Sequence, residues 1–133
     1  MSQSYVLDSN ILIYHLGDSL DAVAKRQLAS AMVQGSYVSI ITRIEILGWQ
    51  GHTPHSRDQT KELLSYFTEI PLNEAIANLC IRLRATQRLK LPDAVIAATA
   101  WYLGLPLMTA KVSDFKGILG LQVINPFEGE VFH

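Results

Sequence analysis

The sequence is short of cysteine, of net charge and of long apolar runs. Cys80 is the single cysteine among 133 residues, which excludes an internal disulfide and any zinc site built from cysteines. The chain has 11 basic and 12 acidic side chains, so no overall basic field would draw in nucleic acid nonspecifically. The most apolar stretch, residues 94–108, is interrupted by Gly104 and Pro106. It therefore predicts a buried helix followed by a strand and not a membrane span.

The opening residues have neither a basic nor an apolar leader segment, and we expect a cytoplasmic protein. A length of 133 residues fits a single domain, residues 1–133. A domain of this size buries roughly 70% of the surface that its unfolded chain exposes. With 49% of its residues apolar, the chain can fold on its own core.

Apolar periodicity predicts strands that alternate with helices. We expect strands at residues 5–7, 37–41, 69–72, 106–109 and 121–124. We expect helices at residues 9–16, 20–33, 42–49, 58–67 and 113–119, a further helix capped by Asn73, and another begun by Pro92, with a polar loop at residues 50–57. This alternation predicts the α/β class, as a three-layer α/β/α sandwich around a mainly parallel sheet.

Four carboxylates stand where an expected strand ends or an expected helix begins: Asp8, Glu45, Asp93 and Asp114. In an open α/β sheet the carboxyl ends of the strands meet at one edge, where the following loops form a crevice. Hard cations such as Mg²⁺ and Mn²⁺ prefer oxygen ligands and accept a phosphate or water into their shell. We therefore predict that these four acids are catalytic and metal-binding, in phosphodiester chemistry.

Each acid also fits an ordinary structural role. Thr42 and Glu45 match a capping box, in which the glutamate reaches back to the backbone at the start of its helix. Asp93 and Asp114 would lie in first helical turns, where the helix dipole favours an anion by about 0.3–1 kcal/mol. Asp8 fits an N-cap. The four positions taken together favour a shared site, because the topology brings all of them to one edge.

Four segments carry a family resemblance: VLDSNIL at residues 6–12, TRIEILG at 42–48, LPDAVIAATA at 91–100 and LMTAKVSDF at 107–115. They resemble, in order and spacing, the motifs of PIN-domain ribonucleases. Within that family the chain is most similar to the short VapC toxins of bacterial toxin–antitoxin pairs. The resemblance covers essentially the whole chain, including VINPF at residues 123–127.

The resemblance implies a PIN-like fold and a nuclease that holds Mg²⁺ or Mn²⁺ between carboxylates and cuts RNA with a metal-activated water. Asp8 and Asp93 would be the central ligands, with Glu45 bound directly or through water. Ser9, Asn10 and Thr109 would orient and support these acids. The resemblance also implies a cognate antitoxin protein as partner, and a homodimer, for which unpaired apolar faces on the early helices provide a further argument.

Lys111 departs from the family pattern, which often has Asn or Asp at this position, three residues before the aspartate of its Asp-Phe pair. The departure leaves Asp114 as the candidate for the fourth acid and weakens the case for a second metal. Lys111, Arg88 and Lys90 are candidate contacts to RNA phosphates. Such basic residues also fit a solvated helix face.

Other functions remain open at this point. A PIN fold without catalysis could serve as a binding module. A receiver-type phosphoacceptor would also use an acidic pocket with a nearby threonine and lysine, which Thr109 and Lys111 supply, but it expects adjacent acids where Ser9 and Asn10 follow Asp8. A phosphatase with an aspartate nucleophile expects Asp-x-Asp, and Asn10 breaks that pattern.

Overall fold

A computed structural model of the chain describes residues 3–127. Its strands are β1 (Val6–Leu7), β2 (Tyr37–Ser39), β3 (Thr68–Ile70), β4 (Leu107–Met108) and β5 (Val123–Ile124). They form one sheet in the order β3-β2-β1-β4-β5, and every neighbouring pair is parallel. The helices are α1 (Ser9–Leu16), α2 (Ala22–Val33), α3 (Ile40–Leu47), α4 (Pro54–Leu64), α5 (Glu74–Thr86), α6 (Leu91–Leu103) and α7 (Val112–Phe115).

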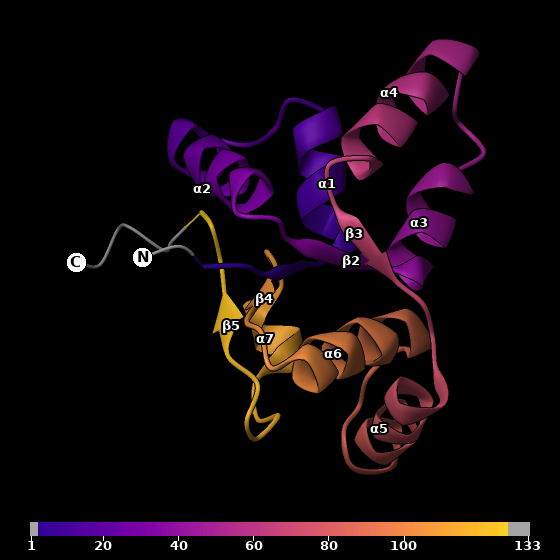
Figure 1. Cartoon of the computed structure of the whole chain (residues 1–133), viewed down its shortest axis with the longest axis vertical. Helices are drawn as coiled ribbons and strands as arrows, with labels where there is room; N and C mark the ends of the chain where they lie inside the picture. Colours follow the sequence, from indigo (N-terminus) through magenta and orange to yellow (C-terminus); the bar gives the residue numbers. More distant parts are fainter. Residues whose placement is uncertain (1–2, 128–133) are drawn as a thin grey trace.

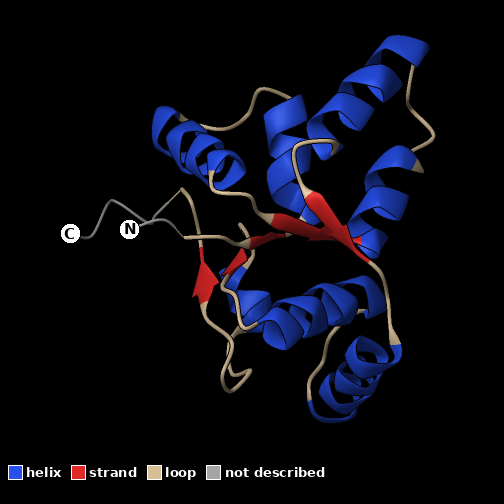
Figure 2. Cartoon of the chain, viewed as in Figure 1, coloured by secondary structure: helices blue, strands red, loops and turns tan. Residues whose placement is uncertain are grey.

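The helices cover the sheet on both faces. Helices α1 to α4 lie on one side of it and α5, α6 and α7 on the other (Figure 1). Figure 2 shows the strands as the thin middle layer between these two groups of helices. The expected three-layer α/β/α sandwich around a parallel sheet is confirmed.

Two apolar cores follow from the alternation of side chains along the central strands. In β1, Val6 packs with the buried residues of α5 and α6, whereas the next residue, Leu7, packs with those of α1 and α2. Leu107 and Met108 of β4 divide in the same way. Every residue of α6 from 94 to 100 is buried, because this helix lies between the sheet and α5.

The boundary between β2 and α3 differs from the expectation. Residues 40 and 41 were expected to continue the strand, but α3 already begins at Ile40. The Ser39 hydroxyl accepts the backbone N–H of Ile41 at 3.1 Å, so a serine N-cap ends the strand two residues early. Thr42 is therefore inside the helix, and the capping-box interpretation of Thr42 and Glu45 is wrong.

Other helix limits also differ, most clearly in α4 and α7. Helix α4 begins at Pro54 within the expected 50–57 loop, because Thr53 and Ser56 form a capping box there and proline is favoured at a first helical position. Helix α7 ends at Phe115, four residues short of the expected limit. Gly117, with φ of 85°, adopts a left-handed conformation that stops a helix. The Asn73 cap is confirmed, since its side chain accepts the Ile76 N–H.

None of the helices within residues 3–127 combines the length and the apolar character that crossing a membrane requires.

Candidate active site

Asp8 lies at the carboxyl end of β1, as the N-cap of α1, and is 2% exposed. Its side chain makes no capping hydrogen bond to the described residues of α1. Its Oδ2 atom instead accepts a hydrogen bond of 2.8 Å from the Thr109 hydroxyl and one of 3.3 Å from the Asn10 amide. The simple N-cap explanation therefore does not account for this carboxylate, which is turned toward the end of β4.

Burial raises the pKa of Asp8 above its ordinary value, and the negative charge of Asp93 raises it further. The hydrogen bond from Thr109 and the positive charge of Lys111 act in the opposite direction. Burial is the largest of these effects. Ionisation of Asp8 is therefore unfavourable, and the residue lies close enough to Asp93 for the two charges to interact.

Asp93 reaches the same place from the first turn of α6, which begins at Leu91 and has Pro92 as its second residue. Its side chain is 13% exposed, and its Oδ1 atom lies 3.6 Å from the Nζ atom of Lys111. The favourable position of an anion at a helix start also applies to Asp93. That role does not explain why a second, buried carboxylate lies beside it.

Glu45 is held beside the start of α1 by Ser9, the residue that follows Asp8. The Ser9 hydroxyl donates a hydrogen bond of 2.7 Å to Glu45 Oε1. The same hydroxyl lies 3.1 Å from that of Thr42, which is fully buried one turn before Glu45 on α3. Ser9 and Thr42 together fix the side of α3 that carries Glu45 against α1.

Thr109 is the centre of a hydrogen-bond network that joins the ends of β1 and β4. Its hydroxyl donates to Asp8 and accepts the Lys111 backbone N–H at 3.0 Å and the Asn10 amide at 3.4 Å. This uses the one donor and both acceptor positions of a hydroxyl group. The side-chain oxygen of Asn10, Oδ1, also accepts the Ala110 backbone N–H at 3.3 Å. The residues around Asp8 are consequently held from two sides.

Asp114 does not share the surroundings of the other acids. It is exposed in the first turn of α7, and its backbone N–H donates to the Lys111 carbonyl at 3.0 Å. Within residues 3–127, no three aspartate, glutamate, histidine or cysteine side chains form a group that could hold a metal. The structure brings Asp8 and Asp93 together, and Glu45 is linked to the Asp8 side of this pair through Ser9. Gathering four carboxylates without a cation would be opposed by their mutual repulsion.

Two of the candidate RNA contacts shortly precede Asp93 in the chain. Lys90 is the N-cap of α6, three residues before Asp93, and Arg88 precedes it in the connection from α5; both are exposed. Two features of the site are not predicted from the sequence. These are the ion pair between Lys111 and Asp93, and the buried Thr42 hydroxyl next to Ser9. The TRIEILG motif contained Thr42, but the capping-box pattern pointed to another role for it.

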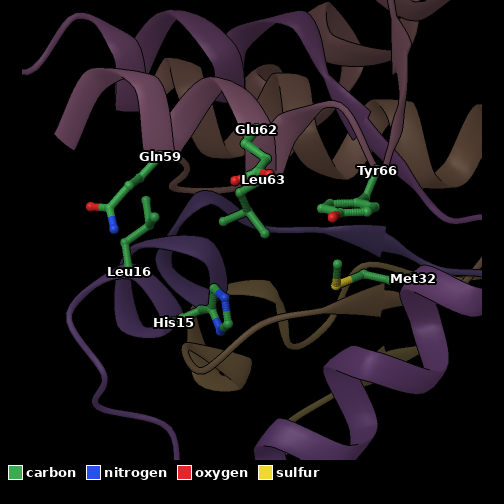
Figure 3. Close-up of a pocket in the computed structure, with 7 residues that line it drawn as sticks. All are labelled: His15, Leu16, Met32, Gln59, Glu62, Leu63 and Tyr66. Carbon is green, nitrogen blue, oxygen red and sulfur yellow. The ribbon is translucent and has the colours of Figure 1, made fainter. Parts of the chain in front are cut away.

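A cavity of about 410 Å³ lies elsewhere, between α1, α2 and α4. Figure 3 shows Leu63 of α4 pointing into a space that His15 and Leu16 of α1 and Met32 of α2 border from the other side. None of the candidate acids lines it. The chemistry expected from the acids therefore does not belong to this cavity.

Comparison with known proteins agrees with this geometry. The model of the PIN domain family matches residues 5–116. A chain of a toxin–antitoxin complex from Klebsiella pneumoniae is 34% identical, with a TM-score of 0.76, over 92% of this chain and 97% of that one. A chain of VapBC-1 from nontypeable Haemophilus influenzae is 25% identical, with a TM-score of 0.77, over 93% and 98%.

A chain of VapBC2 from Rickettsia felis, solved with a DNA fragment from its promoter, has a TM-score of 0.80 at 20% identity, over 92% of this chain and 98% of that one, and supports the fold alone. No curated protein sequence matches the chain at a significant level. The family model covers most of the chain, and the resemblance to VapC-type toxins that the motifs indicated is confirmed. The chain belongs to the PIN-domain family.

Proposed function

We propose that this protein is a metal-dependent endoribonuclease and the toxin of a type II toxin–antitoxin pair. The observation that carries the proposal is the pair formed by Asp8 and Asp93, two carboxylates far apart in the sequence that meet at the carboxyl edge of the sheet. Evidence for the toxin role is the 34% identity to a chain of a toxin–antitoxin complex.

The residues present fit a divalent cation. Asp8 and Asp93 offer carboxylate oxygens, which Mg²⁺ and Mn²⁺ prefer, and Glu45 is hydrogen-bonded to Ser9, the residue that follows Asp8. Burial and the charge of Asp93 make an ionised Asp8 unfavourable without a positive charge nearby. Asp8 and Asp93 would hold the cation, and Glu45 would bind it directly or through water. Asp114 would join only if α7 approached the pair.

A bound cation would supply the positive charge that activates water and neutralises charge developing on the phosphate. The protein's own groups do the positioning. Thr109 and Asn10 hold Oδ2 of Asp8, which leaves the orientation of this carboxylate fixed before substrate arrives. Ser9 holds the carboxylate of Glu45 in the same way, through its hydrogen bond to Oε1. The exposed Lys90 and Arg88 would contact RNA phosphates beside the pair, and Lys111 would do so when its ammonium is free of Asp93.

We propose two protein partners as well. One is a cognate antitoxin, in keeping with the complexes in which similar chains were solved. The other is a second copy of the chain, since Ile13 and Leu16 on α1, Ile44 on α3 and Trp49 just after α3 are large, apolar and exposed. Light scattering of the purified chain would show whether two copies associate in solution.

Two observations favour a non-catalytic binding module as the alternative. Lys111 already supplies a positive charge next to Asp93, and no group of three metal-binding side chains is formed within residues 3–127. A phosphoacceptor role is less well supported, because a carboxylate that is 2% exposed and hydrogen-bonded at Oδ2 is poorly placed to attack a phosphate.

Cleavage of structured RNA by the purified protein, with Mn²⁺ or with EDTA, separates these functions. We expect cleavage with Mn²⁺, none with EDTA, and none by Asp93→Asn. Asp18→Asn is the matched control, because Asp18 also pairs with a lysine but lies in the exposed turn after α1. Cleavage by Asp93→Asn at the wild-type rate, with both variants purified in parallel, would contradict the site assignment. Absence of cleavage by all forms, across varied RNA substrates, would favour the binding module.

A further inference from the structure

Lys111 is placed so that one short loop contacts both acids. Its backbone N–H donates to the Thr109 hydroxyl, which in turn donates to Asp8 Oδ2. The ammonium at the end of its side chain lies 3.6 Å from Asp93 Oδ1. The residues from 109 to 111 thus bring a hydrogen-bond donor to one carboxylate and a positive charge to the other.

The positive charge of Lys111 offsets the repulsion between Asp8 and Asp93, which the fold places close together. Asp8 is 2% exposed and the Asp93 side chain is 13% exposed, so water screens their repulsion poorly. Among the causes that shift the pKa of Asp8, the charge of Lys111 opposes the charge of Asp93. An ammonium beside Asp93 therefore does for the pair what a bound cation would do.

The Lys111 ammonium is also able to move away from Asp93. The Lys111 side chain is 47% exposed, and the lysine stem is flexible, with a point charge that water solvates well. Its backbone, by contrast, is held by Thr109 through the 3.0 Å hydrogen bond. The side chain can swing into solvent while the loop stays in place.

We propose that Lys111 is a built-in counter-ion of the Asp8 and Asp93 pair, which stabilises the metal-free protein and must move away from Asp93 before a divalent cation can bind there. This inference rests on the proposed metal role of the two acids and adds a competition to it. A divalent cation and the ammonium share one carboxylate, so Lys111 lowers metal affinity. Once displaced, the ammonium is left at the edge of the site, where an RNA phosphate would be its next partner.

The test compares wild type with Lys111→Met, which keeps most of the length of the side chain, an unbranched chain one atom shorter, and removes its charge. In EDTA, Lys111→Met should melt at a lower temperature than wild type, and the difference should shrink as salt screens the repulsion. In calorimetric titration without RNA, Lys111→Met should bind Mn²⁺ about tenfold more tightly, which corresponds to about 1.4 kcal/mol. Neither readout uses nuclease activity.

Two further variants control for loss of a side chain. Lys111→Arg keeps the positive charge and should behave as wild type in both measurements. Lys25→Met removes a lysine of similar exposure, 52%, whose Nζ atom lies 3.1 Å from Asp18, a residue with a side-chain exposure of 85%. An exposed pair of this kind contributes little, so Lys25→Met should leave both the melting temperature in EDTA and the Mn²⁺ affinity unchanged.

The possible failures are distinguishable. Equal Mn²⁺ affinity of wild type and Lys111→Met, or an equal melting temperature in EDTA, overturns the counter-ion role and leaves the proposed nuclease standing. Absence of Mn²⁺ binding to both proteins overturns the metal-dependent function together with the competition. If Lys111→Met does not fold, Lys111→Gln replaces it in the same two measurements.

Discussion

The Thr109 hydroxyl donates a hydrogen bond of 2.8 Å to Oδ2 of Asp8, a residue 101 positions earlier in the chain. The two residues meet because β1 and β4 are parallel neighbours, so both residues follow the carboxyl ends of adjacent strands. This contact ties the orientation of the buried carboxylate to the pairing of the central strands. An open parallel sheet repeatedly places its functional groups at this edge.

Thr109→Val should separate this hydrogen bond from packing, because valine has nearly the same shape without the hydroxyl. We expect the free energy of unfolding to fall by about 1–3 kcal/mol, since Asp8 and the Lys111 N–H both lose a buried partner. RNA cleavage should fall roughly 10-fold or more, as for groups that orient a metal ligand.

Thr99→Val provides the control for this variant. Thr99 is equally buried, on α6, but its hydroxyl donates to the Val95 carbonyl within the same helix. It should unfold at a free energy within about 1 kcal/mol of wild type and cleave RNA normally. Equal activity of Thr109→Val and Thr99→Val would show that the hydrogen bond to Asp8 has no part in orienting it.

Asp8→Asn should change how stability depends on pH. Burial and Asp93 raise the pKa of Asp8 in the folded protein above its ordinary value of 3.8. The folded state therefore holds this proton more tightly than the unfolded state does. The resulting stabilisation is fully present below the ordinary pKa and is lost as pH rises through the raised, folded value.

Asparagine keeps an oxygen for Thr109 but has no charge to bury. In EDTA, we expect Asp8→Asn to melt at the same or a higher temperature than wild type, with a gap that is small near pH 4 and widens toward pH 7. Thermal melts of both proteins at several pH values measure this gap. A gap that stays constant, or that narrows as pH rises, would contradict the assigned direction of the pKa shift.

Much of the fold followed from the sequence because its signals are local. Buried β-branched and apolar runs marked the strands, the Asn73 cap marked the start of α5, and their alternation implied the parallel three-layer sandwich. The errors lay at helix ends. Ser39 and Thr53 both compete with other residues as N-caps, and only their hydrogen bonds decide where α3 and α4 begin.

The site was harder to foresee. That Asp8 and Asp93 meet follows from topology, since α6 runs back along the sheet to the start of β4 and so begins near the edge where the parallel strand β1 ends. The position of the Lys111 side chain does not, because it depends on which way a flexible side chain turns near two negative charges. The role of Asp114 at the site stays a prediction. It matched the expected spacing, but α7 stops after four residues and presents it to solvent.

Glu45→Gln tests the third acid. The capping-box role of Glu45 is excluded by the start of α3 at Ile40, and its predicted role at the site is the one that this variant tests. Glutamine keeps an oxygen that can accept the 2.7 Å hydrogen bond from Ser9. We expect the free energy of unfolding to change by less than about 1 kcal/mol, because Glu45 is exposed and neutral substitution at the surface has small effects.

RNA cleavage by Glu45→Gln should nonetheless be lost, because an amide is a poor ligand for a hard cation compared with a carboxylate. Glu62→Gln, which makes the same substitution at an exposed glutamate of α4, is the control for differences in purification between variants. A Glu45→Gln protein that is as active as Glu62→Gln would remove Glu45 from the site.

Expression of the chain alone in a bacterial host tests the proposed toxin role. Growth should stop soon after induction, because an unopposed endoribonuclease destroys RNA faster than the cell replaces it. Asp8→Ala should abolish the arrest at an equal level of soluble protein, and Asp18→Asn should not, since Asp18 lies in an exposed turn. Co-expression of the neighbouring reading frame should restore growth if it encodes the antitoxin. Normal growth with abundant soluble wild-type protein would instead support the non-catalytic module, in which Lys111 permanently balances the acid pair.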